Sequence, residues 1–356
     1  MRVGHLPHLV CPRCKGTLSL FSRQDEPSDE IQTGILQCTA CKKEYPIIDH
    51  IPRFVPLSNY SNSFGFEWLT HAKTQYDSYT HTNISGERFF QETQWERDLR
   101  GQMLLEAGSG SGRFTEIAAS TGATVVSFDM STAVGANYAS NGTRPNVLII
   151  QADLFHLPLR ENYFDKVFCI GVLQHTPDVE DAFFTLTGYV KPKGKLCIDI
   201  YRKYKGILHL FQTRYLIRPL VAGMSPEHLY QLCKKYINAM WQIASIIHKI
   251  PRIGSRINWI LLIPDYRDRF PLSEEILREW AILDIFDILS PVYDSPQYRE
   301  TVEKWFLRAN LVDIQVKYGY NGIEGRGEKQ ERVFERSGGL GEEETPRSEF
   351  ESESSA

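Results

Sequence analysis

The sequence predicts an α/β protein with a mostly parallel sheet covered by helices on both faces, a helical insertion and a small cysteine-rich domain at the N-terminus. Three observations support this fold class. Short apolar strands alternate with helical segments between residues 103 and 200, as they do in βαβ units. A glycine-rich turn follows the first of these strands. Two C-x-x-C pairs lie within residues 11–41, well upstream of the strands.

Length and composition describe an ordinary globular protein with room for about two domains. The chain has 356 residues, of which 42% are hydrophobic and 24% charged. Its net charge of −4 argues mildly against a polyanion as obligate partner, because phosphate backbones usually select a basic surface. Met1–Leu9 lacks the apolar segment of a signal peptide, and charged residues and Pro251 interrupt residues 239–263. We therefore expect a cytoplasmic protein without a membrane span.

The glycine-rich turn is the central functional signal. A buried strand ends at Glu106, three glycines follow at alternate positions, and a helix is expected from about Arg113. Glycine allows positive φ and lets a ligand lie against the backbone, and the helix N-terminus favours an anionic group. The dinucleotide fingerprint G-x-G-x-x-G would require glycine at position 113. The third glycine is instead Gly112, which gives E-x-G-x-G-x-G.

Three later strands also end in polar residues. The strand over residues 123–128 ends in Asp129, which is placed to accept hydrogen bonds from both hydroxyls of a ribose. The next strand ends in Asp153-Leu154, and residues 164–172 lead to His175.

Taken in order, these residues resemble the motifs of class I S-adenosylmethionine-dependent methyltransferases, over roughly residues 103–200. The resemblance implies a Rossmann-like, seven-stranded sheet and S-adenosylmethionine as cofactor. It implies cofactor contacts from the strand ends, namely Glu106, Gly108, Gly110, Gly112, Asp129, Met130, Asp153, Leu154 and Ile170. His175 lies where a general base or an acceptor-positioning group is expected, the alternative being a histidine that only shapes the pocket.

The N-terminal cysteines have the spacing of a tetrahedral zinc site. Cys11 and Cys14 are separated from Cys38 and Cys41 by a hairpin-like segment. Four thiolates leave no open coordination position, so a structural Zn²⁺ is expected. Disulfides or a redox pair are the alternatives, and the expected compartment and local pattern disfavour both. This segment resembles the small zinc-ribbon proteins that activate methyltransferases, although His50 stands where that family usually has glycine.

The chain divides into six predicted segments. They are a zinc ribbon (1–57), entrance helices or linker (58–102), the core (103–205), a helical lid (206–297), the last helix and strand of the core (298–324) and a disordered tail (325–356). In the entrance helices, Arg88 either pairs with the cofactor carboxylate or is simply exposed. Within the lid, helices are expected to begin at Ser225 and Ser273, because serine is a favourable N-cap residue.

Near the end of the lid, Asp284, Asp287 and Tyr293 are candidates for substrate contact. A solvated helix face with a turn tyrosine is the alternative. The leading functional prediction is methyl transfer to a small or medium-sized acceptor. RNA methylation with help from the ribbon, or a non-catalytic cofactor-binding scaffold, are the alternatives, with a dehydrogenase as a more distant one. The sequence does not indicate an oligomeric state.

Overall fold

The computed structural model describes residues 1–23, 29–205 and 212–331. Its N-terminal part is a four-stranded antiparallel sheet of strands in sequential order, preceded by a short 3₁₀ helix, η1 (Val3–His8). The strands are β1 (Leu18–Arg23), β2 (Gly34–Cys38), β3 (Glu44–Ile48) and β4 (Ile51–Pro52). Cys11 and Cys14 precede β1, whereas Cys38 ends β2 and Cys41 lies in the loop before β3.

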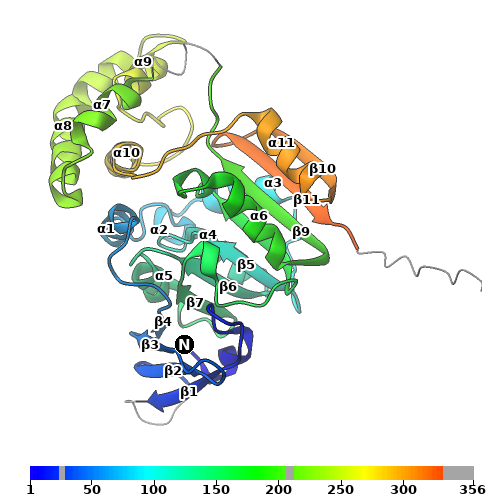
Figure 1. Ribbon diagram of the computed structural model, residues 1–356. Coiled ribbons are helices and arrows are strands. Elements are labelled where there is room, and N and C mark those ends of the chain that lie inside the picture. The colour runs from blue at the N-terminus through cyan, green and yellow to red at the C-terminus, as the bar shows by residue number, and fades with distance from the viewer. Residues whose placement is uncertain (24–28, 206–211, 332–356) are drawn as a thin grey trace, which may run out of the picture.

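Seven strands form the central sheet of the described residues (Figure 1). They are β5 (Met103–Ala107), β6 (Thr124–Asp129), β7 (Val147–Gln151), β8 (Phe164–Ile170), β9 (Val190–Ile200), β10 (Leu311–Tyr318) and β11 (Ile323–Lys329). Their order in space is β10-β11-β9-β8-β5-β6-β7. Strands β5 to β9 pair in parallel, whereas β11 is antiparallel to both β9 and β10. The seven-stranded α/β fold is therefore confirmed.

The tail prediction was wrong for its first residues. Strand β11 continues through Gly325 to Lys329 although it contains almost no apolar side chain. Its glycines let the strand pass beneath a neighbouring ring, because a Cβ on Gly325 would lie 2.6 Å from Cε2 of Phe306. The apolar contact at this point is therefore supplied by the side chain of Phe306 and not by side chains of β11. Residues 332–356, also predicted to be disordered, lie outside the described residues.

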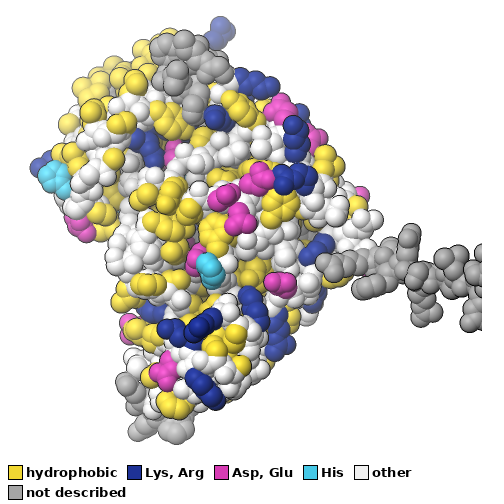
Figure 2. Space-filling model, in the orientation of Figure 1, with side chains coloured by type: hydrophobic (Ala, Val, Ile, Leu, Met, Phe, Trp, Pro, Cys, Tyr) yellow, Lys and Arg dark blue, Asp and Glu magenta, His cyan; other side chains and the backbone are white. Residues whose placement is uncertain are grey.

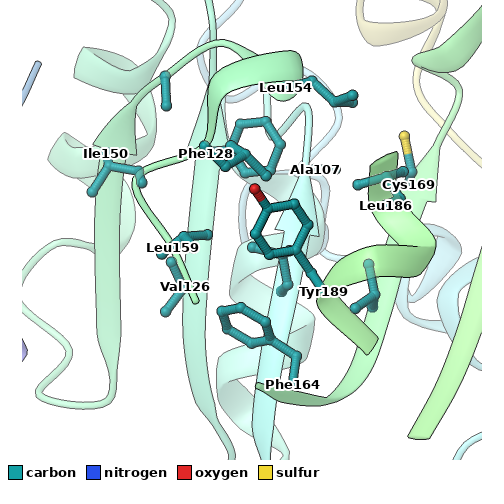
Figure 3. Close-up of a cluster of buried hydrophobic side chains, with 14 of the residues drawn as sticks. Ala107, Val126, Phe128, Ile150, Leu154, Leu159, Phe164, Cys169, Leu186 and Tyr189 are labelled. Atoms are coloured by element: carbon teal, nitrogen blue, oxygen red, sulfur yellow. The ribbon is translucent and has the colours of Figure 1, made fainter. Parts of the chain in front are cut away.

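Helices cover both faces of the sheet. One buried cluster joins α3 (Ile84–Thr93) and α4 (Arg113–Ser120) to β5, β6 and β8, and includes Val134 at the start of α5 (Val134–Asn141). On the other face, a second cluster contains residues of α6 (Val179–Tyr189) and α11 (Arg299–Arg308). Figure 3 shows part of this second cluster, with Tyr189 and Phe164 packed beside the strand residues Val126 and Ala107.

The ribbon and the central sheet share this second core, because Leu9, Leu18 and Leu36 belong to the same cluster. Backbone hydrogen bonds join the two parts: Val10 N–H donates to Pro158 at 2.8 Å, and Phe54 N–H donates to Gln151 at 2.8 Å. Gln151 in turn donates through Nε2 to the carbonyl of Met130 at 3.0 Å. The ribbon is therefore linked to the loop after β6.

The lid has its own core. It consists of α7 (Thr213–Val221), α8 (Pro226–His248), α9 (Gly254–Ile260) and α10 (Glu274–Leu289) around a third buried cluster. The two predicted caps are confirmed, since the hydroxyls of Ser225 and Ser273 accept hydrogen bonds from the N–H groups of His228 and Ile276. Among the described residues, no helix is both long enough and apolar enough to span a bilayer.

Two short helices, α1 (Asn62–Thr70) and α2 (Asp77–Thr80), precede α3 and lie between the lid and the carboxyl edge of the sheet (Figure 1). Contacts of α1 with α8 and α10 on one side and with α5 on the other join the lid to the core. This arrangement places the lid above the ends of the strands that carry the predicted site.

Candidate active site

The tips of β5 and β6 are joined through the glycine turn. The N–H of Gly110 donates to Oδ2 of Asp129 at 2.9 Å, and the N–H and hydroxyl of Ser131 donate to Oδ1 at 2.8 and 2.7 Å. Burial raises the pKa of Asp129, and the hydrogen bonds from Ser131 oppose this effect. The carboxylate is thus fixed at the strand edge, where it remains part of a cavity wall.

Positive φ explains the glycines of this turn. Gly108, Gly110 and Gly112 have φ of 75°, 52° and 95°, a region that residues with a Cβ rarely adopt. Space is limiting as well. A Cβ on Gly108 would lie 2.5 Å from Cγ1 of Val172, and a Cβ on Gly112 would collide with the side-chain amide of Asn137. Only glycine therefore allows the turn to adopt this conformation and to leave its backbone accessible to a ligand.

Glu106 lies behind the turn and does not line the cavity. Its side chain is buried and accepts a hydrogen bond from the hydroxyl of Thr115 in α4. Burial raises the pKa of Glu106 to about 7, although the hydrogen bond from Thr115 lowers it. Asn137 donates to the same Thr115 hydroxyl at 2.9 Å. Asn141 donates to the carbonyl of Gly112 and to Oδ1 of Asn137, both at 3.0 Å, so Glu106 and Gly112 belong to one network at the start of α4.

A cavity of about 940 Å³ lies at the carboxyl edge of the sheet, beneath the lid. Six of the ten predicted cofactor and catalytic residues line it: Gly108, Gly110, Asp129, Met130, Leu154 and His175. Glu106, Gly112, Asp153 and Ile170 do not. Asp153 instead caps the short helix η2 (Leu154–His156) through Phe155 N–H and contacts Nδ1 of His156 at 2.9 Å.

His175 ends the short helix η3 (Leu173–His175) and faces the cavity. Its Nδ1 lies 3.0 Å from the backbone carbonyl of Tyr293. A carbonyl can only accept, so Nδ1 carries the hydrogen, and the neutral ring has its lone pair on Nε2. This Nε2 is buried and has no hydrogen-bond partner among the described residues. The rings of Phe64 and Tyr201 pack against the imidazole at 5.0 and 5.4 Å between centroids.

Two lid acids reach the same cavity. Asp284 accepts from the hydroxyl of Tyr266, and Asp287 accepts from the hydroxyl of Tyr201 at 3.1 Å. Burial raises the pKa of Asp284 to about 7, and burial also raises the pKa of Asp287. Neither residue lies on a solvated helix face. Tyr293 contributes its backbone carbonyl, while its ring packs against Tyr60.

Arg88 also lines the cavity but is not the exposed arginine that one interpretation predicted. It is 6% exposed, its Nε donates to Glu92 at 2.6 Å, and its Nη2 lies 3.5 Å from Asp199. Both carboxylates are buried. A second arginine was missed as a site residue. Arg113 lines the cavity and has no ion pair among the described residues, and burial together with the charge of Arg88 lowers its pKa to about 10.

Aromatic residues of the entrance helices and lid complete the walls. Trp68 lies over the glycine turn, since a Cβ on Gly110 would be 3.1 Å from its Nε1. Tyr266, Trp280 and Tyr320 line the far side. The tyrosines were missed because Tyr266 lies in a loop and Tyr320 in the bend between β10 and β11, where no periodic pattern indicates which way a side chain points.

The four N-terminal cysteines form a second site. Their Sγ atoms lie within 4.8 Å of one another, and no other metal-ligand group of this kind occurs among the described residues. The N–H of Cys41 points at Sγ of Cys38 at 3.4 Å, as expected for a thiolate acceptor. A Cβ on Gly16 would lie 3.1 Å from Sγ of Cys38. This closed four-sulfur set suits a structural Zn²⁺, and the prediction of such a site is confirmed.

Comparison with known proteins agrees with this geometry. Residues 105–198, which contain the turn and the strand ends, match the family described as methyltransferase domain. This segment is a methyltransferase domain. Residues 4–49 match the family described as Trm112p-like protein. The chain therefore carries a Trm112p-like zinc ribbon fused to its methyltransferase domain.

Two curated relatives are similar to part of the methyltransferase domain and its surroundings. A tRNA U34 carboxymethyltransferase of Ruthia magnifica subsp. Calyptogena magnifica is 31% identical over 109 residues, which cover 29% of this chain and 34% of the relative. A ubiquinone biosynthesis O-methyltransferase of Coxiella burnetii is 31% identical over 130 residues, which cover 35% of this chain and 55% of the relative. The match thus spans about half or less of these relatives.

Two solved structures resemble the chain over more of its length. A chain from the complex between the Haloferax volcanii Trm112 methyltransferase activator and a methyltransferase matches with a TM-score of 0.42 and 10% identity, over 76% of this chain and 98% of that one. The YcgJ protein of Bacillus subtilis matches with a TM-score of 0.35 and 15% identity, over 70% of this chain and 99% of that one.

Proposed function

We propose that the protein is an S-adenosylmethionine-dependent methyltransferase that acts on a small or medium-sized acceptor. The observation that carries the proposal is the pairing of Gly110 with Asp129 at the wall of the cavity, inside a methyltransferase domain. Bound S-adenosylmethionine supplies an electrophilic methyl group on a sulfonium. Transfer of this group needs mainly alignment and a dry site, and positioning alone can contribute about 7–11 kcal/mol in favourable cases.

The cofactor would lie along the edge formed by the turn and β6. Asp129 retains acceptor capacity for the ribose hydroxyls beyond its bonds to Gly110 and Ser131. Met130 and Leu154 offer apolar surface for the adenine ring of the cofactor. The open backbone at Gly108 leaves room for the amino-acid end. Four of the predicted residues do not line the cavity and would act only by positioning the groups that do. They are Glu106, Gly112, Asp153 and Ile170.

His175 is the proposed general base for an acceptor that must lose a proton. Its buried Nε2 has no hydrogen-bond partner in the described part of the chain, and Tyr293 fixes the tautomer that leaves the lone pair on this atom. Asp287 lies near this imidazole: burial raises the pKa of Asp287, and the charge of a protonated His175 opposes that effect. An acceptor without such a proton would need His175 only for position.

The lid favours a small acceptor over a nucleic acid. Residues of α7, α9 and α10 line the cavity together with the sheet edge, so the acceptor site is built largely inside the protein. RNA methylation is the second candidate, and two observations favour it: one curated relative is named as a tRNA-modifying enzyme, and the ribbon carries Arg13, Lys42 and Lys43.

Ligand-dependent thermal unfolding tests the cofactor. S-adenosylhomocysteine should raise the unfolding midpoint, because a ligand that binds only the folded state stabilises it. NAD should not. A rise with NAD alone would contradict the methyltransferase proposal.

Product analysis tests the reaction and the base. The protein is incubated with methyl-labelled cofactor and separate metabolite and RNA pools, and labelled products are identified by mass. Label in the metabolite pool supports a small acceptor. Label in RNA would instead show that RNA methylation is the reaction. With the acceptor known, His175→Ala should lower kcat while S-adenosylhomocysteine affinity stays nearly unchanged. His228→Ala, an exposed lid histidine, is the matched control.

A further inference from the structure

The outer side of α8 carries an apolar stripe that nothing in the described chain covers. Leu232, Ala239, Ile243 and Ile246 are spaced by seven, four and three residues, which places them on one face of the helix. All four are exposed, and Ile246 is 68% exposed. The buried residues of α8, such as Ile237 and Trp241, lie on the opposite face. The stripe is therefore a second apolar face and not part of the lid core.

Helices α7 and α9 extend this apolar surface. In α7, Leu216 and Leu220 are one turn apart and are 63% and 73% exposed. In α9, Ile260 is 64% exposed. The hydroxyl of Thr213 donates to the carbonyl of Ile260 at 2.7 Å and the hydroxyl of Tyr236 donates to the carbonyl of Leu261, so the three helices form one layer. Hydrophobic side chains gather over these helices at the upper left of Figure 2.

We call this surface the outer lid face. It consists of Leu216, Leu220, Leu232, Ala239, Ile243, Ile246, Ile250, Ile253 and Ile260. Scattered apolar side chains are normal on protein surfaces, whereas a contiguous group of this kind marks an interaction site.

The charge around the outer lid face identifies the kind of partner. Residues 212–263 contain a single acidic residue, Glu227. The same stretch contains seven basic residues, which are Arg214, Arg218, Lys234, Lys235, Lys249, Arg252 and Arg256. The whole chain, in contrast, has a net charge of −4. Five of the seven, Lys234, Lys235, Lys249, Arg252 and Arg256, are exposed. Basic side chains beside exposed leucine and isoleucine are the composition of helices that lie in the interface of anionic membranes.

The outer lid face also adjoins the cavity. Thr213, Trp259 and Ile260 line the cavity, and Trp259 and Ile260 are exposed as well. The junction of α7 and α9 is therefore shared by the cavity wall and the outer surface.

We propose that the outer lid face docks on the surface of an anionic lipid bilayer. The leucine and isoleucine side chains enter the headgroup region, and Lys235, Lys249 and Arg252 contact lipid phosphates. The helices lie on the membrane without crossing it, in agreement with the lack of a spanning helix among the described residues. Docking is independent of the proposed methyl transfer, and it would hold the mouth of the cavity near lipid-dissolved molecules.

Vesicle co-sedimentation of the full chain tests docking. Phosphatidylglycerol–phosphatidylcholine vesicles should bind the protein, pure phosphatidylcholine vesicles should bind it much less, and added salt should weaken binding. Leu220→Ser with Ile246→Ser should reduce the partition coefficient roughly tenfold or more. The matched control is Phe21→Ser with Leu307→Ser, since these two side chains are each 60% exposed outside the lid. This control should bind as the unchanged protein does.

Charge reversal tests the basic component. Lys235→Glu with Lys249→Glu should lower binding to the anionic vesicles by roughly tenfold or more. Lys43→Glu with Lys304→Glu changes the net charge equally at exposed sites outside the lid and should have a much smaller effect. Circular dichroism and the thermal midpoint of each variant verify that it is folded.

Three results would overturn the proposal. One is no binding to anionic vesicles by the folded, unchanged protein. Another is equal loss of binding in the lid variants and their controls. The third is a stable dimer in light scattering that Leu220→Ser with Ile246→Ser dissociates, because the outer lid face would then be an interface between two copies of this chain.

Discussion

The N–H of Gly110 donates a 2.9 Å hydrogen bond to Oδ2 of Asp129, which joins the tips of β5 and β6. The two strands are neighbours in the sheet, and their paired register brings Ala107 beside Phe128 just before these tips. The carboxylate therefore does two things. It fixes the glycine turn in its positive-φ conformation, and it presents its remaining acceptor capacity to the cavity.

Asp129→Asn should weaken S-adenosylhomocysteine binding by about tenfold to a hundredfold, because hydrogen bonds to a charged group contribute about 1.5–3 kcal/mol. Isothermal titration calorimetry measures the change. Asp165→Asn is the matched control, since Oδ2 of Asp165 accepts from the N–H of Met103 at 2.7 Å at the opposite end of β5. Equal affinity losses in the two variants would show that Asp129 acts only through the fold.

Gly108→Ala should destabilise the protein by roughly 1–3 kcal/mol and abolish measurable cofactor binding. The new methyl group meets both a φ of 75° and the side chain of Val172. Gly101→Ala separates these causes, because Gly101 has a φ of 80° and no atom of the described residues lies within 4 Å of its Cβ position. Urea unfolding measures stability. Adding Val172→Ala should recover part of the loss, and a Gly108→Ala protein with unchanged affinity would refute the explanation.

Arg88→Met should be strongly destabilising, by about 3–5 kcal/mol, because it leaves the buried carboxylates of Glu92 and Asp199 without their cation. Adding Glu92→Gln should restore part of the stability. Arg100→Met is the control: Arg100 pairs with Asp98 at 2.6 Å, but both are exposed, and loss of such a pair should change stability little. Equal urea midpoints for the two single variants would contradict this account.

Cys38→Ser should remove most of the bound zinc, measured by metal analysis of the purified protein, and should lower the thermal midpoint. The ribbon contributes Leu9, Leu18 and Leu36 to the same core as the sheet, so its loss should also expose part of the sheet. Cys233→Ser is the control, because Cys233 is buried in the lid core, away from the four-cysteine site. It should keep its zinc even where it loses stability.

The fold and several residues at the strand-end side of the cavity could be predicted because their signals are local. A glycine turn after a strand, an acid after the next strand and serine before a helix each depend on backbone requirements that a few residues express. Gly108, Asp129 and Ser225 were found in this way. The same logic would have found β11: Asn321-Gly322 is a hairpin signal after β10, and the glycine-rich composition that follows it concealed the strand.

The acceptor side of the cavity could not be predicted, because it depends on which distant elements meet. The sequence left Arg88 either exposed or in contact with the cofactor. One of its two carboxylate partners, Asp199, lies on β9 and comes close only in the folded sheet. Tyr266 and Asp284 meet across the lid for the same reason. Sequence periodicity indicates which face of a helix is buried but not what that face contacts.

Asp284 should make the protein less stable as the pH rises toward neutrality. Burial raises its pKa from the ordinary value of 3.8 to about 7, so between these values the folded state binds more protons than the unfolded state. The free energy of unfolding must then fall as pH rises through this range and become level above about 7, with a slope of at most about 1.4 kcal/mol per pH unit from this group.

Asp284→Asn should reduce that slope and raise stability at alkaline pH relative to the unchanged protein. Asparagine can still accept the hydrogen bond from Tyr266, and the substitution removes a negative charge near the buried carboxyl of Glu67, whose pKa is raised by burial first and then by Asp287 and Asp284. Urea unfolding at pH values from about 5 to about 8 gives the slope. Asp98→Asn is the control that should leave the slope unchanged, since the hydrogen bond from Arg100 lowers the pKa of Asp98 and this carboxyl is ionised in both states across this range. If Asp284→Asn and the unchanged protein keep parallel curves across this range, then Asp284 is ionised in the folded state and does not store the proton that the slope requires.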